Sequence, residues 1–155
     1  MRKIIYVGIL SALLLTACGE ETVKEETPAV DTKKEINPVD KAVKSVTKKP
    51  YEIKQNDGLV SITIEDDKLH EGSKQTILND STELFAELSK VEGITSPSIH
   101  WTSTLTDQYG KESIGEILSI AIDGETFAKI NWDNYKDLDI ESLAHGYKQH
   151  ETLKD

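Results

Sequence analysis

Cysteine is almost absent from this chain of 155 residues, in which Cys18 is the single example. A lone cysteine has no partner for an internal disulfide, so its presence needs another explanation. It is also the one residue that could serve as a thiolate nucleophile or as a soft metal ligand. The fate of Cys18 therefore bears on every class of function.

A hydrophobic run long enough to cross a membrane is lacking too. The apolar stretch 4–15 has twelve residues, whereas a spanning helix needs about 20. Arg2 and Lys3 precede this stretch and small residues end it, which is typical of a secretory signal peptide. We therefore predict that residues 1–17 are a removable leader.

The end of this leader carries the most specific motif in the chain, Leu15-Thr16-Ala17-Cys18. The motif resembles the lipobox of bacterial lipoproteins. The resemblance implies cleavage after Ala17 and transfer of a diacylglyceryl group, with acyl chains such as palmitate, to the Cys18 thiol. Two chains would anchor the protein stably, because one chain alone gives marginal binding. An ordinary signal peptide with a chance cysteine is the alternative.

Aromatic residues are missing from 18–50, which consists mainly of Glu, Lys, Thr, Val and Pro. Such a composition buries too little apolar surface to offset the entropy of ordering, so we predict a lipid-anchored, disordered spacer. Val39, Val43 and Val46 follow helical spacing beside several lysines, which allows a transient helix. The lysines are able to contact lipid headgroups or teichoic-acid phosphates, but a solvated tether is the expectation.

Basic side chains are scarce in residues 51–155, which carry 21 acidic and nine basic groups, a net charge of −12. Nucleic-acid binding depends on cationic neutralisation of phosphates, so that class of function is disfavoured. The segment is long enough to bury one hydrophobic core. We predict a single acidic domain over this range.

Alternating apolar patterns predict the strands of this domain. The expected strands cover 59–64, 99–105 and 114–122, and the third is the most apolar, which predicts a central position in the sheet.

The segment after the third strand fits two structures. Asp123-Gly124 is a strong hairpin signal and predicts a return strand over 126–132. Phe127 and Ile130 also have the spacing of a helical turn with Asp123 as its N-cap, so a helix is the alternative.

Helical periodicity predicts two helices. Apolar residues recur at three- and four-residue intervals over 77–91. Asp80 with Glu83 forms a capping-box pattern that favours a start at residue 80, and a start near Lys74 is the alternative. A second stripe over 140–147 follows Asp139 as N-cap and predicts a closing helix. The order β-α-β-β-β-α indicates an α+β fold, a small mostly antiparallel sheet with helices on one face.

Catalytic motifs are not recognisable. Lipidation would consume the one thiol, and no Gly-x-Ser-x-Gly elbow is present, the nearest run being 112–115. The many carboxyls guarantee chance pairs, which leaves a small carboxylate-based wall hydrolase as the alternative. We predict no enzymatic activity, no catalytic residues and no cofactor.

The four histidines do not form a metal-binding motif. His145 and His150 are five residues apart and would face different sides of a helix, and His70 and His100 have no neighbours at ligand spacing. The run 133–141 fails as an EF-hand because its third and sixth positions are tyrosine and leucine. We predict no metal site, with weak calcium binding left open.

The few aromatic residues are candidates for partner contacts. Tyr109 lies in a predicted turn and should be exposed, whereas core packing is the expectation for both tryptophans. We hypothesise that the 107–112 loop and the segment from Trp132 to Tyr135 form one recognition surface, with Tyr109, Trp132 and Tyr135 as its binding residues.

These features predict a lipid-anchored, non-catalytic binding or interaction module for an envelope protein or an incoming protein. The expected location is the extracytoplasmic face of the cell membrane, reached through the Cys18 lipid, and the Lys- and Ile-rich composition suits a Gram-positive organism.

Overall fold

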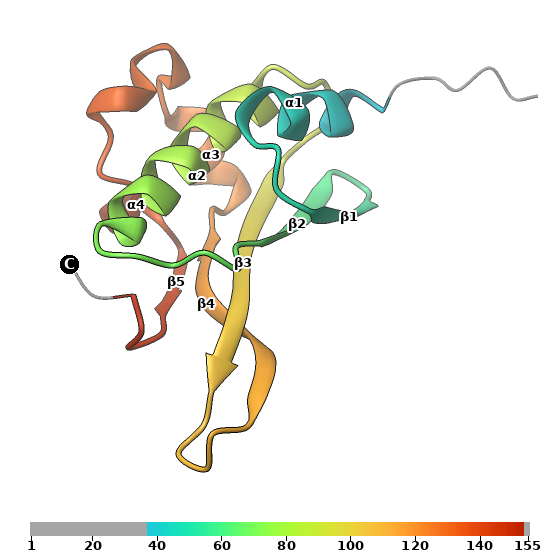
Figure 1. Ribbon diagram of the computed structural model, residues 1–155. Coiled ribbons are helices and arrows are strands. Elements are labelled where there is room, and N and C mark those ends of the chain that lie inside the picture. Colours follow the sequence, from blue (N-terminus) through green and yellow to red (C-terminus); the bar gives the residue numbers. More distant parts are fainter. Residues whose placement is uncertain (1–36, 154–155) are drawn as a thin grey trace, which may run out of the picture. The chain divides into compact units, whose positions relative to one another are not determined.

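The computed structural model of the protein describes residues 37–153, in which five strands form one mixed sheet (Figure 1). Each strand lies beside its neighbour in sequence, and three of the four pairings are antiparallel. The strands are β1 (Tyr51–Asn56), β2 (Leu59–Glu65), β3 (Ser96–Thr106), β4 (Glu112–Ala121) and β5 (Gly146–Gln149).

The one parallel pairing, between β2 and β3, is connected by the long helix α2 (Ser73–Ser89). A parallel pair needs such a crossover because its two strands start at the same end of the sheet. The remaining helices are α1 (Pro38–Val46), α3 (Gly124–Lys129), the 3-10 helix η1 (Trp132–Asp137) and α4 (Ile140–Leu143).

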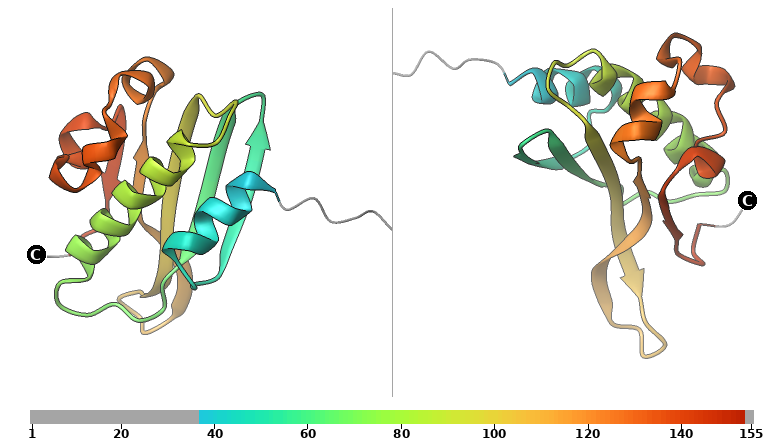
Figure 2. Two further views of the ribbon diagram at one scale, coloured as in Figure 1. Left: turned by 90° about the horizontal axis from the view of Figure 1, so that it is seen from above. Right: turned by 180° about the vertical axis from the view of Figure 1, so that it is seen from behind.

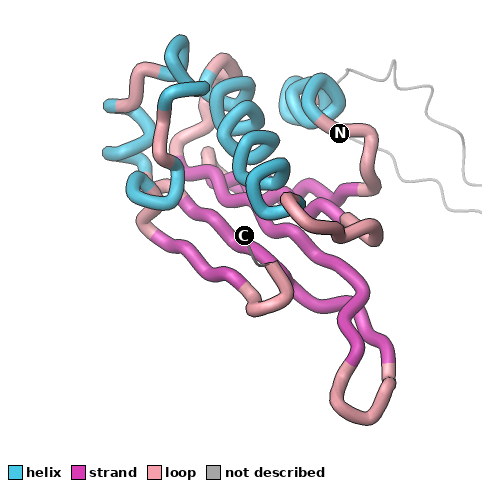
Figure 3. Tube along the Cα trace, turned by 60° about the vertical axis from the view of Figure 1, so that its left-hand side comes forward, coloured by secondary structure: helices cyan, strands magenta, loops and turns pink. Residues whose placement is uncertain are grey.

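The helices cover one face of the sheet (Figure 2 and Figure 3). Strand residues that point to this face, such as Ile62, Ile99 and Ile120, are fully buried, as are Leu84 and Phe85 of α2. The opposite face is polar, because alternate residues of each strand point away from the core. The predicted α+β fold, with a mostly antiparallel sheet and helices on one face, is confirmed.

The domain starts earlier than the predicted residue 51. Asn37 caps α1 by accepting a 2.9 Å hydrogen bond from the Val39 amide, and Pro38 occupies the first turn. Val39 and Val43 are buried in the core, where α1 packs against α2. The valine stripe is therefore one face of a packed helix, and the predicted boundary at residue 50 is wrong. The rest of the predicted spacer and the whole leader lie outside the described residues.

The C-terminal third departs most from the sequence-based expectations. The return strand after Asp123-Gly124 is wrong, and the alternative, a helix capped by Asp123, is confirmed. The segment forms α3, and the Asp123 carboxylate accepts a 3.0 Å hydrogen bond from the Thr126 amide. The closing helix ends at Leu143, and β5 follows it to pair with β4. The central strand is β3 rather than β4.

The beginning of the domain also holds differences. β1 was not anticipated, and α2 begins at Ser73, next to the earlier of the two starts that the sequence allows, rather than at Asp80. The earlier start buries Ile77 and Leu78, which a helix beginning at Asp80 would leave outside the core.

Candidate interaction surface

The hairpin formed by β3 and β4 extends beyond the rest of the sheet (Figure 1). β2 pairs with β3 only as far as Thr102, and β5 pairs with β4 only from Leu118 onward. Ser103 and Ile117 are buried at the base of this extension, and residues 104–116 project as a two-stranded ribbon, which we call the arm.

A β-bulge marks the base of the arm. The β3–β4 register shifts between Trp101 and Thr102, which pair with Leu118 and Glu116, so Ile117 is the extra residue. Ile117 and Leu118 are both fully buried, which fixes the bulge in the core. A bulge increases the local twist of a strand pair, and this one turns the arm away from the plane of its neighbours.

The tip of the arm is ordered by its own hydrogen bonds. The Asp107 carboxylate accepts from the amides of Tyr109 at 2.8 Å and Lys111 at 2.9 Å. The Gly110 amide donates to the Asp107 carbonyl at 3.0 Å. The turn therefore holds its shape without contacts to the body of the domain, and it presents Tyr109 at the end.

The arm carries two of the three large hydrophobic side chains that are exposed in residues 37–153. Tyr109 is 85% exposed and Ile114 is 65% exposed, while the third, Leu59, lies at the start of β2 and is 55% exposed. Single exposed apolar residues are ordinary, but two on one projecting element are typical of a contact surface. Tyr109 matches its predicted exposure.

Trp132 and Tyr135 do not belong to this surface. The Trp132 indole donates a 3.0 Å hydrogen bond to the Phe127 carbonyl. The centroid of its ring lies 5.2 Å from the ring centroid of Phe127 and 6.2 Å from that of Phe85. Tyr135 lines a pocket of about 300 Å³ between η1 and α2. η1 lies at the opposite end of the domain from the tip of the arm (Figure 1 and Figure 3). The hypothesis of one joint surface is therefore wrong.

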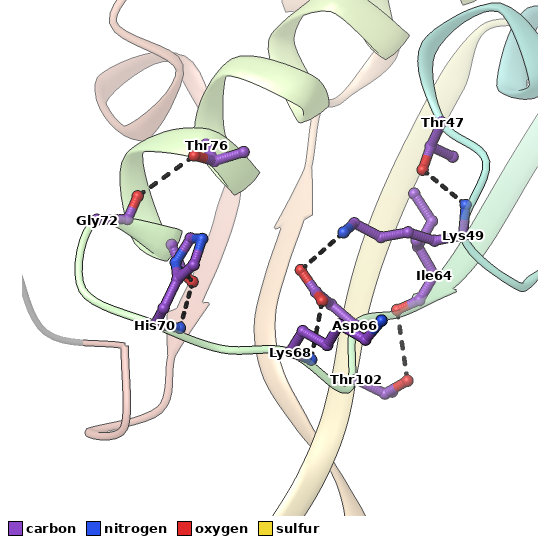
Figure 4. A network of polar contacts seen from close by, with 10 residues as sticks. Thr47, Lys49, Ile64, Asp66, Lys68, His70, Gly72, Thr76 and Thr102 are labelled. Carbon is purple, nitrogen blue, oxygen red and sulfur yellow. Dashed lines mark hydrogen bonds and ion pairs between the residues drawn. The ribbon is translucent and has the colours of Figure 1, made fainter.

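A polar network at the end of β2 determines where the arm begins (Figure 4). Asp66 is nearly buried; its amide donates to the Thr102 carbonyl at 2.8 Å, and its carboxylate lies 3.2 Å from the Lys49 ammonium. The same carboxylate accepts from the Lys68 amide at 3.2 Å. These contacts turn the chain away from β3 toward α2, so β3 continues without β2 beside it and stays paired only with β4.

One nearby carboxyl is electrostatically unusual. Burial raises the pKa of Asp80, on the face of α2 toward this network, and the Lys49 ammonium opposes that rise. The charges of Glu83 and Asp66 raise the same pKa further. The ionised form of Asp80 is thus disfavoured in the fold.

The polar face of the sheet holds a second network. The His100 ring lies 2.8 Å from the Glu116 carboxylate and 3.3 Å from the Ser98 hydroxyl. A hydroxyl, an imidazole and a carboxylate in this order occur in catalytic triads. Ser98, however, lies in mid-strand between β2 and β4, where backbone amides serve the sheet rather than an oxyanion. The network instead joins β3 to the base of the arm.

The remaining histidines and acidic residues do not converge on a metal site. Within residues 37–153, no group of three or more His, Cys, Asp or Glu side chains has a geometry suited to a metal ion. The run 133–141 forms η1 and the N-cap of α4, in which the Asp139 carboxylate accepts from the Ser142 hydroxyl at 2.5 Å.

The predicted lipidation site Cys18 lies outside the described residues. No helix in the part of the chain that the structure describes is long and apolar enough to span a membrane. Comparison with known proteins found no matching family model, no matching curated protein and no matching solved structure.

Proposed function

We propose that this protein is a lipid-anchored binding module on the extracytoplasmic face of a bacterial cell membrane. It is held there through Cys18 and contacts an envelope protein or an incoming protein without catalysing a reaction. The observation that carries the proposal is the arm, which presents Tyr109 and Ile114 beyond the folded body. Aromatic and apolar side chains on a projecting element are typical anchors of protein interfaces.

The charge of the domain supports a particular kind of partner. Residues 51–155 have a net charge of −12, which disfavours anionic polymers and favours proteins with basic surfaces. The same charge keeps the domain away from anionic lipid headgroups, so the arm is available for contact at the end of its tether.

The test is photocrosslinking in intact cells, with benzoylphenylalanine at position 109. We expect one discrete crosslinked protein, lost when Ile114→Ser is added and retained when Leu59→Ser is added. Leu59 is the matched control because it is also exposed and apolar but lies outside the arm. Equal loss with both changes, or the same product from a probe at position 135, would contradict a role for the arm.

The anchor has a separate test. Cys18→Ala should release the protein into the medium and abolish labelling with a fatty-acid analogue. Release without any lipid label on the unaltered chain would show an ordinary secreted protein instead.

The alternative is a small envelope enzyme, for example a carboxylate-based wall hydrolase. The observation that favours it is the raised pKa of Asp80, since catalytic acids are tuned in this way. Muropeptide release by the purified chain, abolished by Asp80→Asn, would establish the enzyme and overturn the proposed function.

A further inference from the structure

The arm leaves one side of β3 without a neighbouring strand. The last β2 contact is the hydrogen bond from the Asp66 amide to the Thr102 carbonyl, 2.8 Å long, after which the chain turns toward α2 (Figure 4). Beyond this point β3 continues for four residues, 103–106, paired on its other side with β4. No strand within residues 37–153 fills the position beside them.

The direction of the backbone groups follows from the alternation of the strand. Successive residues point their N–H and C=O groups to opposite edges. Because the Thr102 carbonyl points toward β2, the groups of Thr104 and Thr106 point to the same, vacant side. Those of Ser103 and Leu105 point toward β4, where they face Gly115 and Ser113.

This edge lacks the protection that the other edges of the sheet have. β1 carries the exposed charged side chains Glu52 and Lys54, and β5 has only four residues. The outer edge of β4 in the arm carries the exposed carboxylates Glu112 and Glu116. Charges and short length discourage pairing with another chain. The segment 103–106 is Ser-Thr-Leu-Thr, uncharged and rich in β-branched side chains, which favour strand pairing.

The surroundings of this edge are acidic. Most charged side chains around it are carboxylates that are partly or fully exposed. They lie at the end of β2, at the tip of the arm and on β4: Glu65, Asp67, Asp107, Glu112 and Glu116. Two lysines, Lys68 and Lys111, oppose them. A second copy of this acidic chain would be repelled, whereas a strand flanked by basic residues is attracted.

We propose that the arm binds an extended segment of its partner protein as an added β-strand alongside residues 103–106. The inference rests on the proposed function and specifies how that contact is made. The added strand receives main-chain hydrogen bonds from Thr104 and Thr106, places an apolar side chain beside Leu105, and has lysine or arginine at its ends. Tyr109 and Ile114 supply the side-chain contacts around it.

The probe is a short capped peptide of alternating valine and threonine between terminal lysines, added to the mature-length chain carrying Cys18→Ala. Amide NMR should show slowed hydrogen exchange and shifted signals at Thr104 and Thr106. The same peptide N-methylated at every residue keeps its charge and side chains but has no N–H group on either edge, so it cannot complete the ladder and should leave both amides unchanged.

The matched variants are Thr104→Pro and Thr104→Val. Proline removes the N–H that faces the vacant side without removing a β3–β4 hydrogen bond, whereas valine keeps that N–H. We expect Thr104→Pro to weaken peptide binding about tenfold or more and Thr104→Val to leave it nearly unchanged. Unchanged signals from Trp101 in both variants would show that the body remains folded.

Strand addition would be overturned by equal binding by the two variants, by protection that maps to β1, β5 or the outer edge of β4, or by no change at Thr104 and Thr106 at the highest soluble peptide concentration. Concentration-dependent protection without peptide would identify a second copy as the occupant and also overturn it. If the crosslink at position 109 survives Thr104→Pro but not Ile114→Ser, strand addition is wrong while the proposed function stands.

Discussion

Trp101 and Tyr109 belong to the same β-hairpin, eight residues apart, yet their surroundings are opposite. Trp101 is fully buried, and its indole donates a 2.8 Å hydrogen bond to the Ser81 hydroxyl of α2. Tyr109 is 85% exposed at the tip of the arm. One hairpin therefore supplies both the centre of the core and the most projecting surface, and the division lies at the bulge beside Thr102.

The difference separates stability from recognition. Side chains in the body are fixed by packing from both the sheet and the helices, whereas a two-stranded ribbon alone is marginally stable in water. The arm is ordered by the bulge at its base and the hydrogen-bonded turn at its tip. Changes in the arm should therefore alter binding with little effect on folding, and changes in the body should do the reverse.

The largest expected effect comes from truncating the two aromatic residues. Trp101→Ala should lower the free energy of unfolding by about 3–5 kcal/mol, because it leaves a cavity and removes the indole donor to the Ser81 hydroxyl, which keeps only its own hydrogen bond to the Ile77 carbonyl. Tyr109→Ala should change it by less than about 0.5 kcal/mol. Urea denaturation of the two variants measures both values. Similar losses would mean that the arm packs against the body in solution.

The next comparison uses two turn glycines with left-handed backbone. Gly58, at φ +83°, joins β1 to β2, and a Cβ there would lie 2.8 Å from the Gly93 carbonyl oxygen. Gly110, at φ +77° in the tip of the arm, has no such neighbour within 4 Å. Gly110→Ala should therefore cost about 1 kcal/mol from backbone strain alone.

Gly58→Ala should cost about 3 kcal/mol, since overpacking against rigid backbone adds to the strain. Thermal or urea unfolding of both variants measures the difference. Equal losses would indicate that the β1–β2 turn shifts freely, which the hydrogen bond from the Thr95 amide to the Gly58 carbonyl, 2.9 Å long, argues against.

Much of the fold follows from local patterns in the sequence. β2 and α2 were predicted because their apolar residues alternate or recur over a long enough range, and the α+β fold followed from them. α1 was assigned to the spacer because three valines among lysines bury enough surface only when α2 is already present to receive them.

The C-terminal elements depend more on tertiary contacts. Asp123-Gly124 suits a hairpin and a helix cap equally, and burial of Phe127 beside Trp132 favours the helix. The stripe over 140–147 would form one helix if its last residues did not pair with a strand. In the structure these residues form β5 on the free edge of β4, and Tyr147 of β5 lies opposite Ile120 of β4.

The candidate surface was predicted only in part. Exposure of Tyr109 follows from its place in an Asp-Gln-Tyr-Gly turn. The projection of the arm does not follow from local sequence. It arises because β3 is longer than β2 and β4 is longer than β5, so the ends of β3 and β4 have no neighbouring strand on their outer sides. Separation of Tyr135 from Tyr109 likewise depends on where α3 and η1 cross the helical layer.

A smaller effect is expected from acid. Hydrogen bonds from Thr126 lower the pKa of Asp123; the bond from its amide has the larger effect and the bond from its hydroxyl the smaller. The hydrogen bond from the Ser142 hydroxyl lowers the pKa of Asp139 in the same way. A lowered pKa means that the ionised form is favoured in the folded state. Both caps therefore stabilise the body at neutral pH, and their contribution is lost as the pH falls through the folded-state pKa, below the ordinary 3.8.

Carboxyl NMR titration measures this directly. Thr126→Val removes the hydroxyl donor, so it should move the pKa of Asp123 back toward its ordinary value while leaving that of Asp139 unchanged. A titration of Asp123 that does not respond to Thr126→Val would show that the cap is not formed in solution. The arm should remain unaffected in either case, because neither cap touches it.

The smallest effect has the opposite sign and comes from Asp80. Its pKa is raised mainly by burial, so the charged form is disfavoured in the folded state, and the resulting penalty is present above the folded-state pKa and absent below the ordinary value. Asp80→Asn should therefore raise the urea midpoint slightly at neutral pH and leave it unchanged in acid, while Asp80→Glu, which keeps the charge, should give no gain. A loss of stability with Asp80→Asn would mean that the attraction to Lys49 outweighs the burial. Natural chains retain destabilising charges where function needs them. If Asp80→Asn raises stability and leaves crosslinking at position 109 unchanged, Asp80 has no part in recognition by the arm, and any role it has belongs to the body of the domain.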